Sequence, residues 1–135
     1  MFLLDTNVVS ELRKRKPHGA VLAWLEAQAP ASLFISAMTF GELQRGIELT
    51  RAQDVNKAAE LETWLEDVLA SGQVLALDAP VCRVWARLMH RRSEALVEDA
   101  FIAASAQVHR LTIASRNVRD FKLLGVTAVN PFDHR

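Results

Sequence analysis

Three acidic side chains, Asp5, Glu42 and Asp99, occupy positions where a lone carboxylate is hard to accommodate. Asp99 heads a helical stripe whose i+3, i+4 and i+7 neighbours are all apolar, and burial without a positive partner disfavours its charge. Asp5 ends a short apolar run, and the i−4, i+4 and i+7 neighbours of Glu42 are uncharged. Taken singly, each acid has an ordinary explanation: a helix cap for Asp5, an ion pair with Arg45 for Glu42, and a first-turn helix charge for Asp99.

Taken together, the three acids predict a metal site. Three carboxylates that meet at one place repel one another and cannot all remain ionised without a positive partner. A hard divalent cation relieves this repulsion, and Mg²⁺, or plausibly Mn²⁺, binds through a few carboxylates while keeping several waters. Such an ion activates water and neutralises a phosphoryl oxygen during in-line displacement. The expected chemistry is therefore metal-assisted hydrolysis of a phosphate ester.

The elements that must position these acids alternate along the chain between short apolar runs and helical patterns. We expect strands over residues 2–4, 33–36, 74–77, 111–114 and 126–129. We expect the main helices over residues 39–50, 54–69, 80–88 and 98–109. This alternation predicts an α/β fold: a three-layer α/β/α sandwich around a central, mostly parallel sheet of four or five strands. The 135 residues suit a single domain spanning 1–135, without repeats or linkers.

Ligands of open parallel sheets bind beyond the carboxyl ends of the strands. Asp5 directly follows the first expected strand, and Glu42 lies one helical turn beyond the second. Arg116 and Asn117 follow the fourth strand, with Asp120 nearby. The topology therefore predicts that these polar side chains gather at one edge of the sheet.

The composition excludes several classes of protein. Sixteen Lys and Arg balance sixteen Asp and Glu, so the formal net charge is zero and no broad positive field attracts nucleic acid or anionic membranes. The lone Cys82 is consistent with a reducing cytosol, and the sequence shows neither a signal peptide nor a membrane span. We expect a cytoplasmic protein without membrane contact. Zinc-ligand spacing and glycine-rich phosphate loops do not occur.

Five sequence segments, in this order, resemble those of PIN-domain ribonucleases. They are Asp5-Thr6-Asn7, Phe40-Gly41-Glu42-Leu43, the segment from Glu98 to Ala104, Ala114-Ser115-Arg116-Asn117 and Val129-Asn130-Pro131-Phe132. The resemblance covers essentially the whole chain and is greatest to the VapC toxins of VapBC-type (type II) toxin–antitoxin pairs, within the FitB-like group. It implies a Mg²⁺-dependent endoribonuclease, often a homodimer, that is inhibited by a small VapB- or FitA-like antitoxin and linked through it to operator DNA.

The resemblance also implies which residues are catalytic and bind metal. Asp5, Glu42 and Asp99 match the family's acidic triad, and Asn117 stands at a fourth position that is often aspartate. An asparagine carbonyl can ligate a metal but adds no negative charge, so the number of bound metals, one or two, remains open. Asp120 could substitute in part for the missing aspartate. Asp5 and Asp99 are expected to be the main ligands, while Glu42 holds or deprotonates the attacking water. Hydroxyls of the residues after the two strands, Thr6 and Ser115, are expected to orient the carboxylates.

Cationic side chains near these acids are candidate contacts for the RNA backbone. Lys14 and Arg15 lie in a four-residue basic run, although such a run fits favourable charge at the end of a helix better than an RNA contact, and Arg116 adjoins the expected site. A second basic row, Arg83, Arg87 and Arg91, fits a solvated or interface face better than an RNA groove. The tryptophans are expected in the core or in a dimer interface.

Two alternatives remain open. The chain could be a PIN fold that has lost catalysis and serves as a binding module, which the asparagine at position 117 favours. Less favoured is a phosphoacceptor receiver domain with Asp78 as the acceptor, since such a domain needs an acidic pair after the first strand and a lysine after a later one. The sequence supplies one acid and no lysine at those places.

Overall fold

Five short parallel strands form the centre of the molecule, and the computed structural model describes all 135 residues. The strands lie in the order β3-β2-β1-β4-β5. Their bounds are β1 (Phe2–Leu4), β2 (Leu33–Ser36), β3 (Val74–Leu75), β4 (Thr112–Ala114) and β5 (Ala128–Val129). The predicted α/β class and parallel sheet are confirmed, although β3 and β5 are only two residues long, shorter than the apolar runs suggested.

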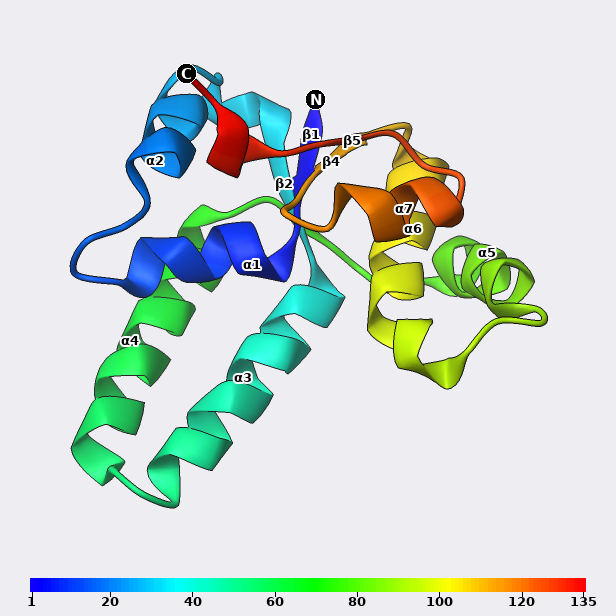
Figure 1. Cartoon of the computed structure of the whole chain (residues 1–135). Helices are drawn as coiled ribbons and strands as arrows, with labels where there is room; N and C mark the ends of the chain where they lie inside the picture. The colour runs from blue at the N-terminus through cyan, green and yellow to red at the C-terminus, as the bar shows by residue number, and fades with distance from the viewer.

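Seven α-helices and four short 3₁₀ turns surround the sheet (Figure 1). The helices are α1 (Thr6–Val9), α2 (Gly19–Glu26), α3 (Ala37–Arg51), α4 (Val55–Ser71), α5 (Ala79–Met89), α6 (Val97–His109) and α7 (Val118–Leu123). The 3₁₀ turns are η1 (Ser10–Arg13), η2 (Pro30–Ser32), η3 (Glu94–Leu96) and η4 (Pro131–Asp133). No helix combines the length and apolar character needed to cross a bilayer.

Alternate residues of the strands supply the cores on the two faces of the sheet. Leu3 and Ile113 face a core shared with α6 and α7, whereas Leu4 and Ala114 face a core shared with α1 and α2. This follows from the two-residue period of a strand, which sends successive side chains to opposite faces. The helices α1 to α4 accordingly lie on one side and α5 to α7 on the other (Figure 1).

Side-chain caps determine where several helices begin. Ser36 accepts from the N–H of Met38, so α3 begins at Ala37, two residues earlier than its apolar pattern suggested. Asp54 caps α4 and Asp78 caps α5 in the same way, since each carboxylate accepts an N–H that no helical carbonyl can reach. Asp78 thus has a structural task at an edge strand.

The helical pair α3 and α4 extends beyond the edge of the sheet (Figure 1). A small core of Ile47, Ala58, Leu61 and Leu65 holds the two helices together. The first half of α3 remains against the sheet and carries Glu42 toward the strand ends, while its second half forms one wall of a hollow described below.

Candidate functional site

The site lies where the strand order changes direction, between β1 and β4. The chain proceeds from β1 outward to β2 and β3, and then returns to place β4 on the other side of β1. Two backbone hydrogen bonds continue the ladder past the strand ends: Asp5 N donates to Ala114 O at 2.9 Å, and Ser115 N donates to Val129 O at 2.9 Å. Asp5 and Ser115 are therefore neighbours at the carboxyl edge, where open parallel sheets bind ligands.

Hydrogen bonds hold the Asp5 carboxylate in one orientation. Ser115 Oγ donates to Oδ2 at 2.6 Å, Thr6 N donates to Oδ1 at 2.8 Å, and Asn7 Nδ2 reaches Oδ2 at 3.3 Å. The residue is only 4% exposed. Burial raises the pKa of Asp5 above its usual value, and the bonds from Ser115 and Thr6 offset part of that rise. Asp5 thus caps α1 and also presents a fixed, buried carboxyl group at the sheet edge.

Two threonine hydroxyls connect Glu42 to the first residue of α1. Thr6 Oγ1 donates to Glu42 Oε1 at 2.9 Å, and Thr39 Oγ1 lies 3.0 Å from Thr6 Oγ1. Because Thr6 has a single hydroxyl hydrogen, the buried Thr39 must donate to Thr6. Burial raises the pKa of Glu42, Thr6 lowers it, and the charge of Asp5 is the first of three acidic neighbours that raise it further.

The ion pair suggested for Glu42 is not formed. Arg45 instead bonds Glu98 across to α6, with 3.0 Å between Nη1 and Oε1, and Glu42 keeps its bond to Thr6. Glu42 is therefore held by a neutral hydroxyl and has no positive partner.

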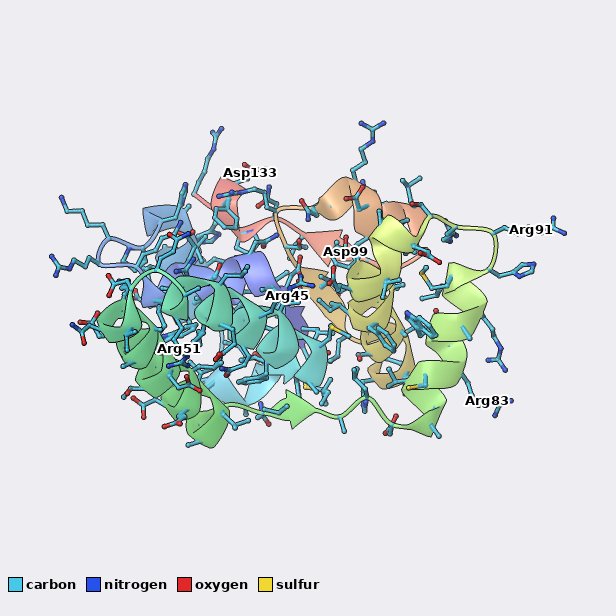
Figure 2. All side chains as sticks on the ribbon, turned by 90° about the horizontal axis from the view of Figure 1, so that it is seen from below. Arg45, Arg51, Arg83, Arg91, Asp99 and Asp133 are labelled. Atoms are coloured by element: carbon cyan, nitrogen blue, oxygen red, sulfur yellow. The ribbon has the colours of Figure 1, made fainter.

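Asp99, in the first turn of α6, has the largest pKa shift of the acids at the site. Burial raises the pKa of this half-buried carboxyl to about 6 from its ordinary 3.8, and the charges of Asp5, Asp120 and Glu98 add to the rise. Figure 2 shows Asp99 at the end of α6, on the side toward α3. No salt bridge of the chain involves Asp5, Glu42 or Asp99. The three acids predicted from the sequence therefore influence one another electrostatically, without a compensating cation.

Asn117 and Asp120 approach the site from α7, a helix that the sequence patterns did not predict. Asn117 is exposed at the N-cap position, where its backbone N–H donates to Ser115 Oγ at 2.9 Å and its side chain makes no hydrogen bond. Asp120 is half-buried and close enough to Asp99 to raise the pKa of that carboxyl. The structure therefore places a second oxygen donor from α7 beside the triad, in addition to the amide of Asn117.

The donor set suits a hard cation, although the carboxylates are not drawn into a ready-made cage. No three carboxyl, thiol or imidazole groups of the chain lie close enough together to enclose a metal ion. The candidate donors are all oxygens, and burial, followed by repulsion from neighbouring acids, raises the pKa values of Glu42 and Asp99. A cation of the Mg²⁺ type keeps several waters and needs only one or two direct carboxylates, so this arrangement fits such an ion.

The basic residues near the site differ in whether a carboxylate already pairs with them. Lys14 forms a salt bridge with Glu11, a carboxylate only 5% exposed that also accepts from His18 N at 3.0 Å. Arg15 is exposed and has no salt bridge, whereas the guanidinium of Arg116 lies 3.8 Å from the centre of the Phe132 ring. Lys14 thus takes part in anchoring its own loop, and Arg15 and Arg116 are the predicted phosphate contacts that remain without a carboxylate partner.

The other sequence candidates lie away from the triad. Arg83 extends outward from α5, whereas Arg91 extends from the turn that follows this helix (Figure 2). The expected basic row therefore does not continue along one helix face, because α5 ends at Met89. Trp24 packs in the core against Phe2, and Trp85 stacks on Phe101 with ring centres 4.4 Å apart. These contacts agree with a structural role for both tryptophans.

A hollow beside Glu42 could not be found from the sequence. It has a volume of about 260 Å³ and lies between α1 and η1 on one side and α3 and α4 on the other. Its lining consists of Thr6, Ser10, Arg13, Glu42, Leu43, Gly46, Ile47, Thr50, Leu61 and Trp64. The apolar periodicity of a helix does not predict such a hollow, because the hollow depends on how far apart α3 and α4 lie beyond the sheet.

The chain matches known proteins over nearly its whole length. The family model of the PIN domain matches residues 2–126. The chain is 34% identical to Toxin FitB of Neisseria gonorrhoeae and 37% identical to VapC ribonuclease Y4jK of Sinorhizobium fredii; each match covers 98% of this chain and 99% of the relative. A solved structure of FitAB bound to an IR36 DNA fragment is 32% identical, with a TM-score of 0.83 over 100% of this chain and 98% of that chain.

Proposed function

Because the chain belongs to the PIN-domain family, we propose that it is a divalent-metal-dependent endoribonuclease, the toxin of a VapBC-type toxin–antitoxin module. The observation that carries this proposal is the group of uncompensated acids Asp5, Glu42 and Asp99 at the carboxyl edge of β1 and β4, all with raised pKa values. Repulsion among carboxylates destabilises a fold unless a bound ligand neutralises it. Carboxyl groups with strongly shifted pKa values at the edge of a sheet therefore indicate a functional site. The proposed substrate is RNA. We propose that the protein acts in the cytoplasm.

In this mechanism Asp5 and Asp99 hold the cation, for which we propose Mg²⁺ or Mn²⁺, and Asn117 and Asp120 offer further oxygens. A cation held there would supply a water molecule of lowered pKa and charge neutralisation at a phosphoryl oxygen. Ser115 prevents the Asp5 carboxylate from rotating, because its hydroxyl and the Thr6 N–H hold the two carboxylate oxygens separately.

Glu42 orients the attacking water and accepts its proton. The pKa of Glu42 is raised toward neutral pH, and a general base works best when its pKa lies near the working pH. Thr6 holds one of the two carboxylate oxygens in place. The expected products carry a 5′-phosphate and a 3′-hydroxyl. Arg15 and Arg116 contact phosphates that flank the cleaved bond, and the Phe132 ring supports the guanidinium of Arg116.

A small antitoxin of the VapB or FitA type is the proposed protein partner, and the chain itself is proposed to form a homodimer. The FitAB–DNA structure supports a complex that reaches operator DNA through the antitoxin. Charge complementarity predicts that basic antitoxin side chains cover the acidic site. An antitoxin that still inhibits after all its arginines are replaced would contradict this arrangement.

The direct test is cleavage of transfer, ribosomal and messenger RNAs by the purified chain, with Mg²⁺, with Mn²⁺ and with chelator. We expect cleavage only with a divalent cation. We expect Asp5→Asn and Asp99→Asn to reduce it by about 100-fold or more, since each removes a charged ligand. Asp67→Asn, an exposed position on α4, is the matched control and should retain activity.

Two outcomes would reject the proposal. Full cleavage by a folded Asp5→Asn or Asp99→Asn variant would remove these residues from the chemistry. A wild-type chain that binds RNA but cleaves none of the panel with either cation would instead favour the non-catalytic binding module. Comparing Asn117→Ala with Asp120→Asn shows which side chain of α7 contributes to activity.

A further inference from the structure

The hollow beside Glu42 is continuous with the candidate active site. Thr6 and Glu42 belong to its lining as well as to the acidic site. Its volume of about 260 Å³ lies below the roughly 300–1,000 Å³ of pockets that take drug-sized ligands. A space of this size beside a catalytic carboxylate suits one ring system attached to the reacting chain.

The walls of the hollow suit a planar aromatic ring. Four apolar side chains line it: Leu43, Ile47, Leu61 and Trp64. Trp64 is half-buried and packs at the junction of two core clusters, so its position is supported from behind. Contact between a base and one aromatic side chain contributes roughly 5- to 150-fold in affinity.

The polar groups of the lining mainly offer acceptors. Ser10 Oγ donates to the backbone oxygen of Asn7 at 3.4 Å, and Thr50 Oγ1 donates to that of Gly46 at 3.0 Å. Each hydroxyl thus uses its single hydrogen on the backbone and presents lone pairs to the hollow. Such a lining favours a base that brings its own N–H groups.

Arg13 is the one positively charged residue of the lining. It is exposed, forms no salt bridge and ends η1, close to the basic run. An exposed guanidinium at the edge of a base-sized hollow is suited to a backbone phosphate, because it can bond two phosphate oxygens at once.

Gly46 keeps the hollow open. Glycine in the middle of a helix weakens it relative to alanine, and Gly46 lies in the interior of α3. A Cβ placed on Gly46 meets no atom within 4 Å, so no close packing requires glycine there. Without a side chain at position 46, the wall of the hollow is recessed.

We propose that this hollow binds one unpaired nucleobase of the substrate RNA, next to the cleaved bond, and prefers bases with an exocyclic amino group over uracil. Adenine, cytosine and guanine each offer amino hydrogens to the acceptors of Ser10 and Thr50. Uracil has two carbonyl oxygens facing those acceptors and a single N–H. This inference rests on the proposed ribonuclease function and adds a source of sequence preference to it.

The principal test is Gly46→Met, which places a side chain in the hollow without steric conflict with the backbone. Gly41→Met is the matched control, because Gly41 lies in the same helix, also has open space and lines a separate hollow. Cleavage of single-stranded oligonucleotides with each base at each position gives kcat/KM by position. We expect the wild type to disfavour uracil by about tenfold or more at one position. Gly46→Met should lose that preference and raise KM, whereas Gly41→Met should keep it.

Thr50→Val provides a second test that preserves the size of the hollow. It removes an acceptor, so the preference for amino-bearing bases should weaken while apolar contact remains. Thr63→Val is its control, since the exposed Thr63 on α4 makes a similar hydroxyl bond to Ala59 O and lies outside the hollow.

Binding of the same oligonucleotides in chelator, followed by fluorescence anisotropy, separates this inference from the proposed function. If the wild type cleaves no RNA but binds with the expected base preference, the ribonuclease proposal fails and the base site stands. An unchanged base profile in Gly46→Met, or no preference in the wild type, overturns the base site. Loss of antitoxin binding in Gly46→Met with an unchanged base profile would also overturn it and assign the hollow to a protein side chain.

Discussion

The raised pKa of Asp99 predicts a measurable pH dependence of divalent-cation binding. A carboxyl group must lose its proton before it ligates a metal, so the apparent affinity follows the ionised fraction of the ligand. The pKa of Asp99 rises from 3.8 to about 6, first through burial and then through Asp5, Asp120 and Glu98. Cation binding should therefore weaken as the pH falls through about 6, well above the range of an ordinary aspartate.

The size of the effect follows from the two pKa values. At pH 5 a carboxyl group with a pKa of about 6 is only about one-tenth ionised, whereas one at 3.8 is about nine-tenths ionised. Cation affinity at pH 5 should thus be about tenfold weaker than at pH 8, equivalent to about 1.4 kcal/mol. An unperturbed Asp99 would change it by little. Because the pKa values of Asp5 and Glu42 are also raised, the observed fall can only be steeper.

Isothermal titration of metal-free protein with Mn²⁺ between pH 5 and pH 8 measures this dependence. Asp120→Asn removes one of the charges that raise the pKa of Asp99, so its binding curve should move to lower pH. Asp99→Asn should bind more weakly at every pH, and Asp67→Asn should match the wild type. Affinities at pH 5 and pH 8 that agree within about twofold would refute the assignment of Asp99 as a perturbed metal ligand.

Three further substitutions test the supports of the site. Ser115→Ala removes the 2.6 Å bond to the buried Asp5 and should lower the free energy of unfolding by about 1–2 kcal/mol, measured in urea. Thr6→Val releases Glu42 and should reduce RNA cleavage about 10- to 100-fold in a kinetic assay, whereas Thr6→Ser should retain activity. Glu11→Gln should lower the stability by about 1 kcal/mol at pH 7. A bonded lysine lowers the pKa of Glu11 below its usual 4.5, so this difference should disappear as the pH falls through that lowered pKa in pH-dependent thermal unfolding.

The positions of the strands could be predicted because their apolar runs are short and end at polar residues. The run of residues 2–4 and that of 111–114 both occur as central strands, with β4 one residue shorter. Once the sheet is parallel, the general rule for ligand sites places Asp5 and Ser115 at one edge. The run of residues 74–77 predicts a longer strand than the structure forms, since only two of its residues pair, at an exposed edge of the sheet.

Other features depend on contacts between residues far apart in the sequence, which periodicity does not report. The partner of Arg45 is Glu98 on another helix, although an i+3 pairing with Glu42 is just as consistent with the sequence. The proximity of Asp120 to Asp99 depends on α7, whose six residues are too few for a clear amphipathic pattern. Buried Glu11 likewise has no apolar stripe to mark it, and its task of holding the basic loop is visible only in the structure.

The zero net charge of the chain conceals an acidic edge that has no basic partner. The acids Asp5, Glu42 and Asp99 share an edge where no basic side chain neutralises them, although several exposed arginines are available elsewhere. A sequence selected for stability alone would pair these charges, because like charges in a partly buried site raise one another's pKa and disfavour folding at neutral pH. Their separation leaves the acidic edge open to a cation, and in the proposed function a bound cation is what allows this edge to approach an RNA phosphate.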